Sequence, residues 1–231
     1  MENPSANLLG SRCMYGHPEF DLYEAIYTTR SMRRLKPDPV APELIVKVVE
    51  AATMGPSGGN RQPWKFVIVR DADTKAFVAE RYMKAWSRYF TGKARALVEN
   101  DPQHPQSRIL RSAKYLAEHI ADVPVMLFGC VKRYTDTGRE GQPMFNAIFP
   151  AIQNLCLAAR GYGLGTSLTG LHVRYGDEIN ARLGVPEEYA NVALIPMGYP
   201  KGRWDRPARR PALEVTYWEK WGNASASVPA K

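Results

Sequence analysis

The residues best suited to hold an anion are clustered in the segment Arg30-Ser31-Met32-Arg33-Arg34. A guanidinium group can bind a phosphate through two parallel hydrogen bonds, and a serine hydroxyl can add another. Basic residues at the end of a helix also complement the helix dipole while they remain in water. The segment therefore fits two interpretations, a phosphate-binding site and a solvated helix end.

A second candidate is a loop of small and amide residues, Pro56-Ser57-Gly58-Gly59-Asn60-Arg61-Gln62-Pro63-Trp64. Its paired glycines would let the backbone approach a flat ligand closely, and the amides of Asn60 and Gln62 could recognise the edge of a heterocycle. The alternative is a plain turn between a helix and a strand, which uses the same residue types.

Glycines are also dense in the segment 161–170, where Gly161, Gly163 and Gly165 are spaced like part of a dinucleotide-binding fingerprint. That fingerprint follows a strand and opens a helix, whereas these glycines follow a predicted helix and precede a predicted strand. A Rossmann turn is therefore excluded. Backbone N–H groups of the segment could still line the face of a flat cofactor.

Arginines gather again near the C-terminus, in Arg203-Trp204-Asp205-Arg206-Pro207-Ala208-Arg209-Arg210-Pro211. A solvated basic tail is one interpretation of such a run. The position of the run favours another, because it follows a predicted core strand and precedes Trp218 and Trp221. We expect these two tryptophans to dock and hold the tail in place.

No set of side chains suited to acid–base, nucleophilic or metal chemistry is evident. The sequence has no GxxxxGK[S/T], GxSxG or HExxH motif, and its four histidines are scattered. Cys13, Cys130 and Cys156 are too widely spaced for a zinc site or a disulfide framework, and the last two lie in apolar stretches where buried thiols are expected. No metal and no catalytic side chain are predicted, so a cofactor would carry the chemistry.

Composition limits the class of protein and its location. The 231 residues are 45% hydrophobic and 23% charged, as in an ordinary soluble globular protein. Apolar runs such as 123–131 are far shorter than the roughly 20 residues of a membrane span, and the N-terminus has no secretory pattern. A cytoplasmic protein without a membrane partner is expected.

The net charge of +8 would suit a nucleic-acid partner. The arginines, however, gather in two short clusters that are not interleaved with aromatic residues as a single-strand platform would be. A phosphorylated cofactor explains the two clusters as well as a polynucleotide does, and no nucleic-acid partner is predicted.

Periodicity, capping residues and β-branched runs predict the elements that must position these segments. We expect helices over 19–29, from Pro42 to before Gly55, and over 74–99, 109–120, 145–160 and 175–183. Strands are expected over 64–69, 123–131 and 191–197, and a short strand or loop over 164–171. The helix over 145–160 is predicted to be central and buried. The polar stretch 100–107 is predicted to be a mobile lid, and four aromatic residues before it are expected to be exposed: Tyr82, Trp86, Tyr89 and Phe90.

This order of elements predicts an α+β fold with helices around a mixed central β-sheet. The expected domain covers 19–221, including a C-terminal extension at 203–221. A flexible arm, 1–18, would precede it and a flexible tail, 222–231, would follow it.

Taken together and in this order, the segments resemble the nitroreductase family of FMN enzymes, and the resemblance spans residues 20 to 221. The shared features are an Arg/Ser/Arg cluster after the first helix, a P-S-x-x-N-x-Q-P-W loop before the first long strand, a Gly-rich segment after the central helix, and a C-terminal arginine close to a proline. The resemblance implies a homodimer whose chains exchange their C-terminal extensions, with FMN at the interface.

The resemblance also implies which residues bind FMN. The phosphate and ribityl chain would be held by the first cluster, a second group would come from the partner subunit, and a third would present backbone N–H groups to the reactive nitrogen of the ring. These groups are Arg30, Ser31, Arg33 and Arg34; Pro56, Ser57, Asn60 and Gln62; and Leu168, Thr169 and Gly170, while Arg209 or Arg210 would complete the phosphate clamp.

Two features depart from the family pattern. Many members have an acidic residue where this chain has Thr169, and the region 74–120 resembles an enlarged substrate-lid zone. The implied reaction is ping-pong hydride transfer from NADPH or NADH through FMN to a nitroaromatic, quinone or enone. Two alternatives stay open: a family variant that dehalogenates, dehydrogenates or fragments flavin, and a flavin- or nucleic-acid-binding protein without turnover.

Overall fold

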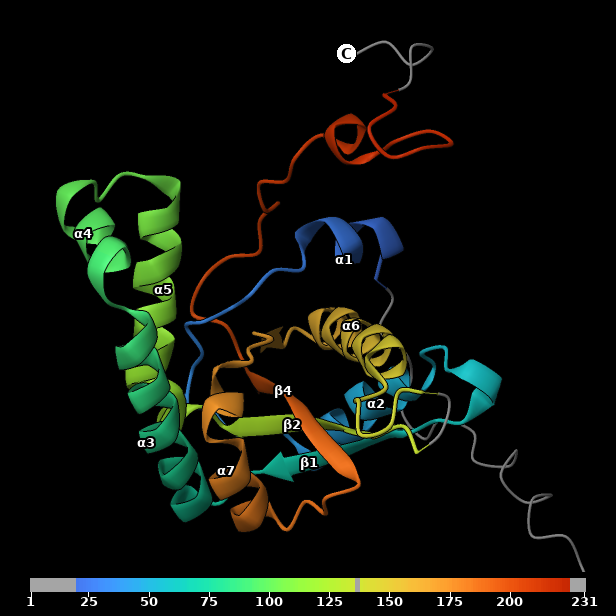
Figure 1. Cartoon of the computed structure of the whole chain (residues 1–231). Coiled ribbons are helices and arrows are strands. Elements are labelled where there is room, and N and C mark those ends of the chain that lie inside the picture. The colour runs from blue at the N-terminus through green and yellow to red at the C-terminus, as the bar shows by residue number, and fades with distance from the viewer. Residues whose placement is uncertain (1–19, 136–137, 225–231) are drawn as a thin grey trace, which may run out of the picture.

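A computed structural model describes residues 20–135 and 138–224, so the expected arm at 1–18 and most of the expected tail at 222–231 lie outside the described residues. The fold is α+β, as predicted (Figure 1). Its centre is a four-stranded sheet in the order β1-β2-β4-β3, built from Trp64–Val69, Val125–Lys132, Tyr189–Gly198 and Gly165–Thr166.

The sheet differs from the predicted mixed sheet, because all three strand pairings in the described chain are antiparallel. The connections explain the difference. β1 ends at Val69 opposite Met126, beside the start of β2, so the helices between them leave and re-enter the sheet at the same end. Such a return produces antiparallel neighbours, whereas a crossover to the opposite end would produce parallel ones.

Two helical layers cover the sheet (Figure 1). Alternate residues of β2 serve the two layers: Val125 and Leu127 pack with α2 (Pro42–Thr53) and α6 (Phe145–Gly161), while Met126 and Phe128 pack with the opposite layer. The period-two alternation of a strand makes this division possible. The opposite layer contains α3 (Ala72–Tyr89), α5 (Pro105–His119) and α7 (Gly176–Leu183). Cys130 and Cys156 are buried thiols, as expected.

Several predicted elements are confirmed within a residue or two. α2 begins at Pro42 in the first helical turn, where proline costs no hydrogen bond, and β1 has the predicted bounds. α6 is the central buried helix that its apolar surface predicts. Among the described residues, the short helical elements are α1 (Leu22–Thr28) and the 3₁₀ turns η2 (Gly58–Asn60), η3 (Ile120–Asp122), η4 (Leu171–Tyr175) and η5 (Ala212–Val215).

The prediction for the region 74–107 was wrong in two respects. The single expected helix is two, α3 and α4 (Gly92–Asn100), separated where Gly92 has φ +47°. The expected mobile lid at 100–107 is a short capped turn that leads into α5. Ser107 is buried and donates to the carbonyl of Asp101 at 2.6 Å. The polar residues of this stretch therefore supply hydrogen bonds to the ends of the helices and do not form a loose loop.

Two of the aromatic residues expected to be exposed are buried. Tyr82 and Trp86 face the sheet and α5 from α3 and are only 3% and 4% exposed, whereas Tyr89 is exposed, as expected. Their burial reflects the second helical layer, in which the apolar face of the amphipathic α3 packs in the core.

The tail, residues 201–224, runs away from the sheet past α1 (Figure 1). Trp218 and Trp221 do not dock on the described part of this chain as expected: they are 46% and 91% exposed. α1 itself presents Leu22, Tyr23 and Ile26 to solvent. The outer end of the molecule therefore carries unburied apolar side chains on two neighbouring segments.

Candidate functional site

The first arginine cluster lies on an extended strap, residues 30–36, held along its length by backbone hydrogen bonds. The Met32 N–H donates to the Thr166 carbonyl at 2.8 Å, and the Lys36 N–H donates to the Tyr199 carbonyl at 2.7 Å. Gly165 permits this closeness, because a Cβ there would lie 2.8 Å from the Met32 Cβ. The strap thus joins the start of β3 to the chain after β4.

The three arginines of the strap have different surroundings. Arg30 donates to the Arg203 carbonyl at 2.8 Å, and the guanidinium carbon of Arg34 lies 4.1 Å from the centre of the Tyr115 ring. Arg33 is half-buried, and burial lowers its pKa against the opposing effect of the neighbouring Tyr82 phenol. No carboxylate of the described residues lies within ion-pair distance of any of the three. An anion at this strap would neutralise a partly buried positive charge.

The glycine-rich segment lies directly beside the strap, as a shared site requires. Ser167 and Thr169 donate their N–H groups to the carbonyls of Pro196 and Leu194 at 3.2 and 2.9 Å, which fixes the segment against β4. The Thr169 N–H is therefore not free to face a ligand, contrary to expectation. Leu168 and Gly170 remain as candidate donors; both are exposed.

The Thr169 side chain links this segment to α3. Its hydroxyl lies 2.9 Å from the Tyr82 hydroxyl, and the Leu171 N–H points to it at 3.4 Å. Burial raises the pKa of Tyr82, so the phenol stays protonated. Sequence reasoning missed Tyr82 because it was expected on the surface. A tyrosine on the inner face of an amphipathic α3 was the available signal.

The loop 56–62 has a constrained backbone. Gly59, Asn60 and Gln62 have φ values of +60°, +51° and +47°, a region that residues other than glycine seldom adopt. Ser57 Oγ accepts from the Gln62 N–H at 3.0 Å, and the Gln62 side-chain amide donates to Asn60 Oδ1 at 3.1 Å. Strain of this kind is held by the surrounding structure and is typical of functional sites.

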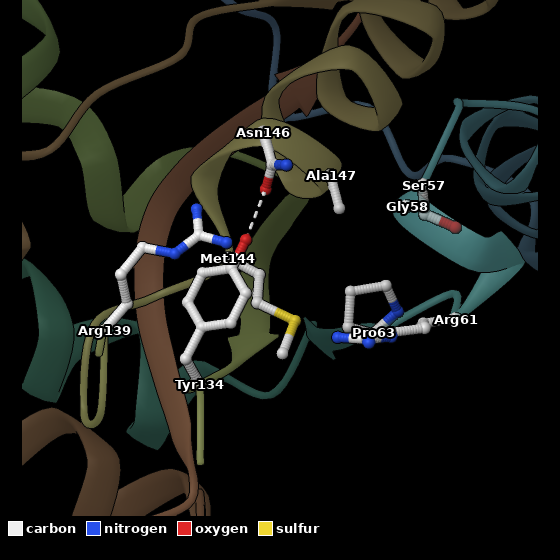
Figure 2. Close-up of a pocket in the computed structure, with 9 residues that line it drawn as sticks. All are labelled: Ser57, Gly58, Arg61, Pro63, Tyr134, Arg139, Met144, Asn146 and Ala147. Carbon is white, nitrogen blue, oxygen red and sulfur yellow. Dashed lines mark hydrogen bonds between the residues drawn. The ribbon is translucent and has the colours of Figure 1, made fainter. Parts of the chain in front are cut away.

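This loop is not close to the strap in the same chain. It borders a cavity of about 230 Å³ with the N-terminal part of α6, lined in part by Asn146 and Ala147 (Figure 2). The strap lies near the other end of α6, where Arg160 donates to Thr28 at 3.3 Å. Asn146 and Arg160 are fourteen residues apart in α6, so the helix separates the cavity from the strap by roughly 20 Å.

The same cavity contains a small polar group that was not predicted. The Tyr134 hydroxyl donates to Asn146 Oδ1 at 3.2 Å, and the guanidinium carbon of Arg139 lies 4.1 Å from the Tyr134 ring centre. Figure 2 shows Arg139 beside this ring and Ser57 across the opening. Of the loop residues predicted to bind FMN, Ser57 therefore lines this cavity, whereas Pro56, Asn60 and Gln62 do not.

The second arginine cluster is anchored only at its root. The guanidinium carbon of Arg160 lies 4.3 Å from the Trp204 ring, and that of Arg206 lies 4.4 Å from the Tyr27 ring. Arg209 and Arg210 are exposed, and among the described residues Arg209 donates only to the neighbouring Ala208 carbonyl. This chain does not bring them to the strap.

His172 is fully buried and serves the core. Its Nε2 lies 3.0 Å from Asn191 Oδ1, its ring meets Phe128 edge-on, and burial lowers its pKa to about 4.

Within 20–135 and 138–224 no cluster of three potential metal ligands occurs. In the same ranges, no helix has both the length and the apolarity needed to cross a membrane.

The strap and the glycine segment define an α+β protein with a basic edge beside its outermost strand. The chain belongs to the nitroreductase family, because the sequence profile described as Nitroreductase family matches residues 26–199.

The named relatives perform different reactions. A putative NADH dehydrogenase/NAD(P)H nitroreductase from Methanothermobacter thermautotrophicus is 29% identical over 210 residues, covering 88% of this chain and 89% of that one. A 5,6-dimethylbenzimidazole synthase from Rhodospirillum rubrum is 30% identical over 196 residues, covering 82% and 85%. A crystal structure of an FMN and NADPH-dependent nitroreductase from sphigopyxis sp. strain HMH has a TM-score of 0.66 at 22% identity, covers 87% of this chain and 100% of that chain, and shows the shared fold.

Proposed function

We propose that the protein is an FMN-dependent oxidoreductase that takes hydride from NADPH or NADH and then reduces a small electron-poor acceptor, such as a nitroaromatic, quinone or enone. The observation that carries the proposal is the half-buried Arg33, which has no carboxylate partner in the described chain and lies on a strap bonded to the glycine segment. A donor set of arginines and a serine fits a phosphate. Bound FMN would supply the hydride transfer itself.

The residues of the chain would bind and orient the cofactor. Arg30, Ser31 and Arg33 would hold the phosphate, with Arg34 stacked on Tyr115 at the end of the strap. The N–H groups of Leu168 and Gly170 would face the ring and stabilise negative charge on it, since fixed donors in a site of low dielectric constant need no reorganisation. Thr169, tied to β4 and to Tyr82, would keep these donors in position.

A second copy of the chain would complete the site. The loop with Pro56, Ser57, Asn60 and Gln62 lies roughly 20 Å from the strap along α6, and the tail carries Arg209 and Arg210 away from it. A homodimer in which each chain lends its loop and tail to the other would bring these groups together. It would also cover the apolar residues of α1 and the tail tryptophans.

The test is spectroscopic. The purified protein should be yellow and should bleach under anaerobic conditions when NADPH or NADH is added. The double substitution Arg209→Ala with Arg210→Ala should weaken FMN retention strongly. A colourless protein that cannot be reconstituted with FMN would overturn the proposal.

A second candidate is a family variant that breaks down flavin or acts as a dehalogenase or dehydrogenase. The 30% identity to a 5,6-dimethylbenzimidazole synthase favours keeping it. The two candidates separate under oxygen: an NAD(P)H oxidoreductase regenerates intact FMN over many turnovers, whereas a flavin-fragmenting enzyme consumes the FMN that is supplied.

A further inference from the structure

A second cavity, of about 410 Å³, adjoins the glycine segment on the side of α3. One wall comes from the C-terminal turns of α3 and the other from the start of η4. The lining residues are Ala85, Arg88, Tyr89, Gly170, Leu171 and Arg174. Gly170 belongs both to this cavity and to the candidate ring-binding segment, so a molecule in the cavity would lie next to the place where hydride transfer is proposed.

The cavity has an excess of positive charge. Arg88 and Arg174 come from different elements, and no carboxylate within the described ranges forms an ion pair with either one. Of the acidic residues nearest in sequence, Glu80 and Glu178 both pair with Arg81 at 2.9 Å, and Asp177, at the start of α7, does not line the cavity. Two guanidinium groups that share one cavity repel each other unless an anion lies between them.

The walls of the cavity are held in a fixed relation. Trp86 stacks on Phe90 at 5.2 Å between ring centres, which orders the end of α3, and Tyr82 joins α3 to Thr169. The guanidinium carbon of Arg88 lies 5.8 Å from the Tyr175 ring centre, within the range of a cation–π contact. A Cβ at Gly170 would meet nothing within 4 Å, so the floor of the cavity is open to a ligand.

We propose that this cavity binds an anionic group, a carboxylate or a phosphate, on the molecule that reacts next to Gly170. The inference rests on the proposed function for what reacts there. Two molecules could carry the group: an acceptor with a carboxylate, or NADPH with its additional ribose phosphate. In either case Arg88 and Arg174 determine specificity, and a neutral analogue of the same size binds more weakly.

Binding is measured first, by calorimetry on the FMN-loaded protein without turnover. The probes are para-nitrobenzoate against para-nitrobenzamide, and NADP⁺ against NAD⁺. The variants are Arg88→Gln, Arg174→Gln and their combination. Arg70→Gln is the matched control, since Arg70 is exposed and precedes α3, whose axis places Arg88 roughly 24 Å away.

Each substitution should weaken binding of para-nitrobenzoate or of NADP⁺ about tenfold, the effect of losing one charge-assisted hydrogen bond, while its comparison probe, para-nitrobenzamide or NAD⁺, keeps its affinity. The Arg70→Gln protein should bind all four probes as the wild type does. Loss confined to para-nitrobenzoate identifies an anionic acceptor. Loss confined to NADP⁺ identifies the reductant. The KM of the affected substrate should rise with little change in kcat.

Equal affinities within both probe pairs, or affinities unaffected by the substitutions, would overturn the inference. The flavin would still bleach with NADPH or NADH in that case, so the proposed function would stand. Conversely, a protein that fails to bleach but binds anions through Arg88 and Arg174 would refute the proposed reaction and keep the anion site.

Discussion

The strap and the tail are both rich in arginine, yet the structure treats them in opposite ways. The strap is bonded on both sides to the sheet, and its apolar residues Met32 and Leu35 are buried. The tail is held only near Trp204, and beyond it every arginine is exposed. The comparison teaches that an arginine cluster becomes part of a site when the backbone beneath it is fixed. The described part of this chain provides no surface on which the outer part of the tail is buried.

The largest expected effect is on the strap. Gly165→Val places its Cβ 2.8 Å from the Met32 Cβ, so the strap must move away from β3. We expect a loss of about 3 kcal/mol in the free energy of unfolding, the upper range for overpacking, measured by urea denaturation. Gly176→Ala is the control, because a Cβ there meets nothing and φ is −58°. Equal stability of the Gly165→Val and wild-type proteins would contradict the proposed close packing.

Lowering the pH should destabilise the core beneath both regions, because His172 is buried there in its neutral form. The folded pKa of His172 is about 4, below its ordinary 6.5, so the unfolded chain binds a proton more readily between these values. Stability is therefore full above pH 6.5 and falls as the pH drops towards 4, by about 2 kcal/mol at pH 5. Urea denaturation at pH 7 and pH 5 measures the loss. His172→Gln should remove most of this difference, whereas an unchanged difference would assign the acid sensitivity to other groups.

A smaller effect is expected at the link between α3 and the glycine segment. Tyr82→Phe removes the hydrogen bond to Thr169 without changing the ring, which should cost about 1 kcal/mol and weaken protection of the amides at 169–171 in hydrogen exchange. Thr169→Val removes the same bond from the other side. If the bond is the only common cause, the double variant should lose little more than either single variant.

The smallest effect is expected in the tail. Trp221 is 91% exposed, so Trp221→Ala should change the unfolding free energy of an isolated chain by less than about 0.5 kcal/mol, measured at low protein concentration. At high concentration the proposed homodimer predicts a further loss, because the tryptophan would then be buried in the other copy. A loss independent of concentration would mean that the tail docks on its own chain, as the sequence first suggested.

The sequence predicted best those elements whose signals are local. Pro42 marks the start of α2, the β-branched run marks β1, and the apolar surface of α6 marks its burial. The break before Gly92 was missed because helical periodicity continues across it, and α5 was expected to begin too late because the polar residues before Ile109 were assigned to a lid. The antiparallel sheet depends on where the helices return, which no local pattern specifies.

The site was predicted as separate pieces, and the structure joins only some of them. The strap meets the glycine segment through the bond from Met32 to Thr166, a pairing between distant residues that no spacing rule supplies. Tyr82 was missed because it was expected on the surface, and Arg88 and Arg174 because each looks like an ordinary surface arginine until α3 and η4 face each other. The roles of the expected FMN residues remain predictions.

Arg160 fastens the first described helix and the root of the tail at the same point. Its guanidinium lies between the rings of Phe20 and Trp204, at 4.5 and 4.3 Å, and pairs with Glu24 at 3.0 Å. A change that loosens α1 should therefore also loosen the root of the tail, and the reverse should hold. The indole of Trp204 is a built-in fluorescent reporter of α1, so its emission should change when Glu24 is replaced by glutamine, although the substitution lies in a distant part of the sequence.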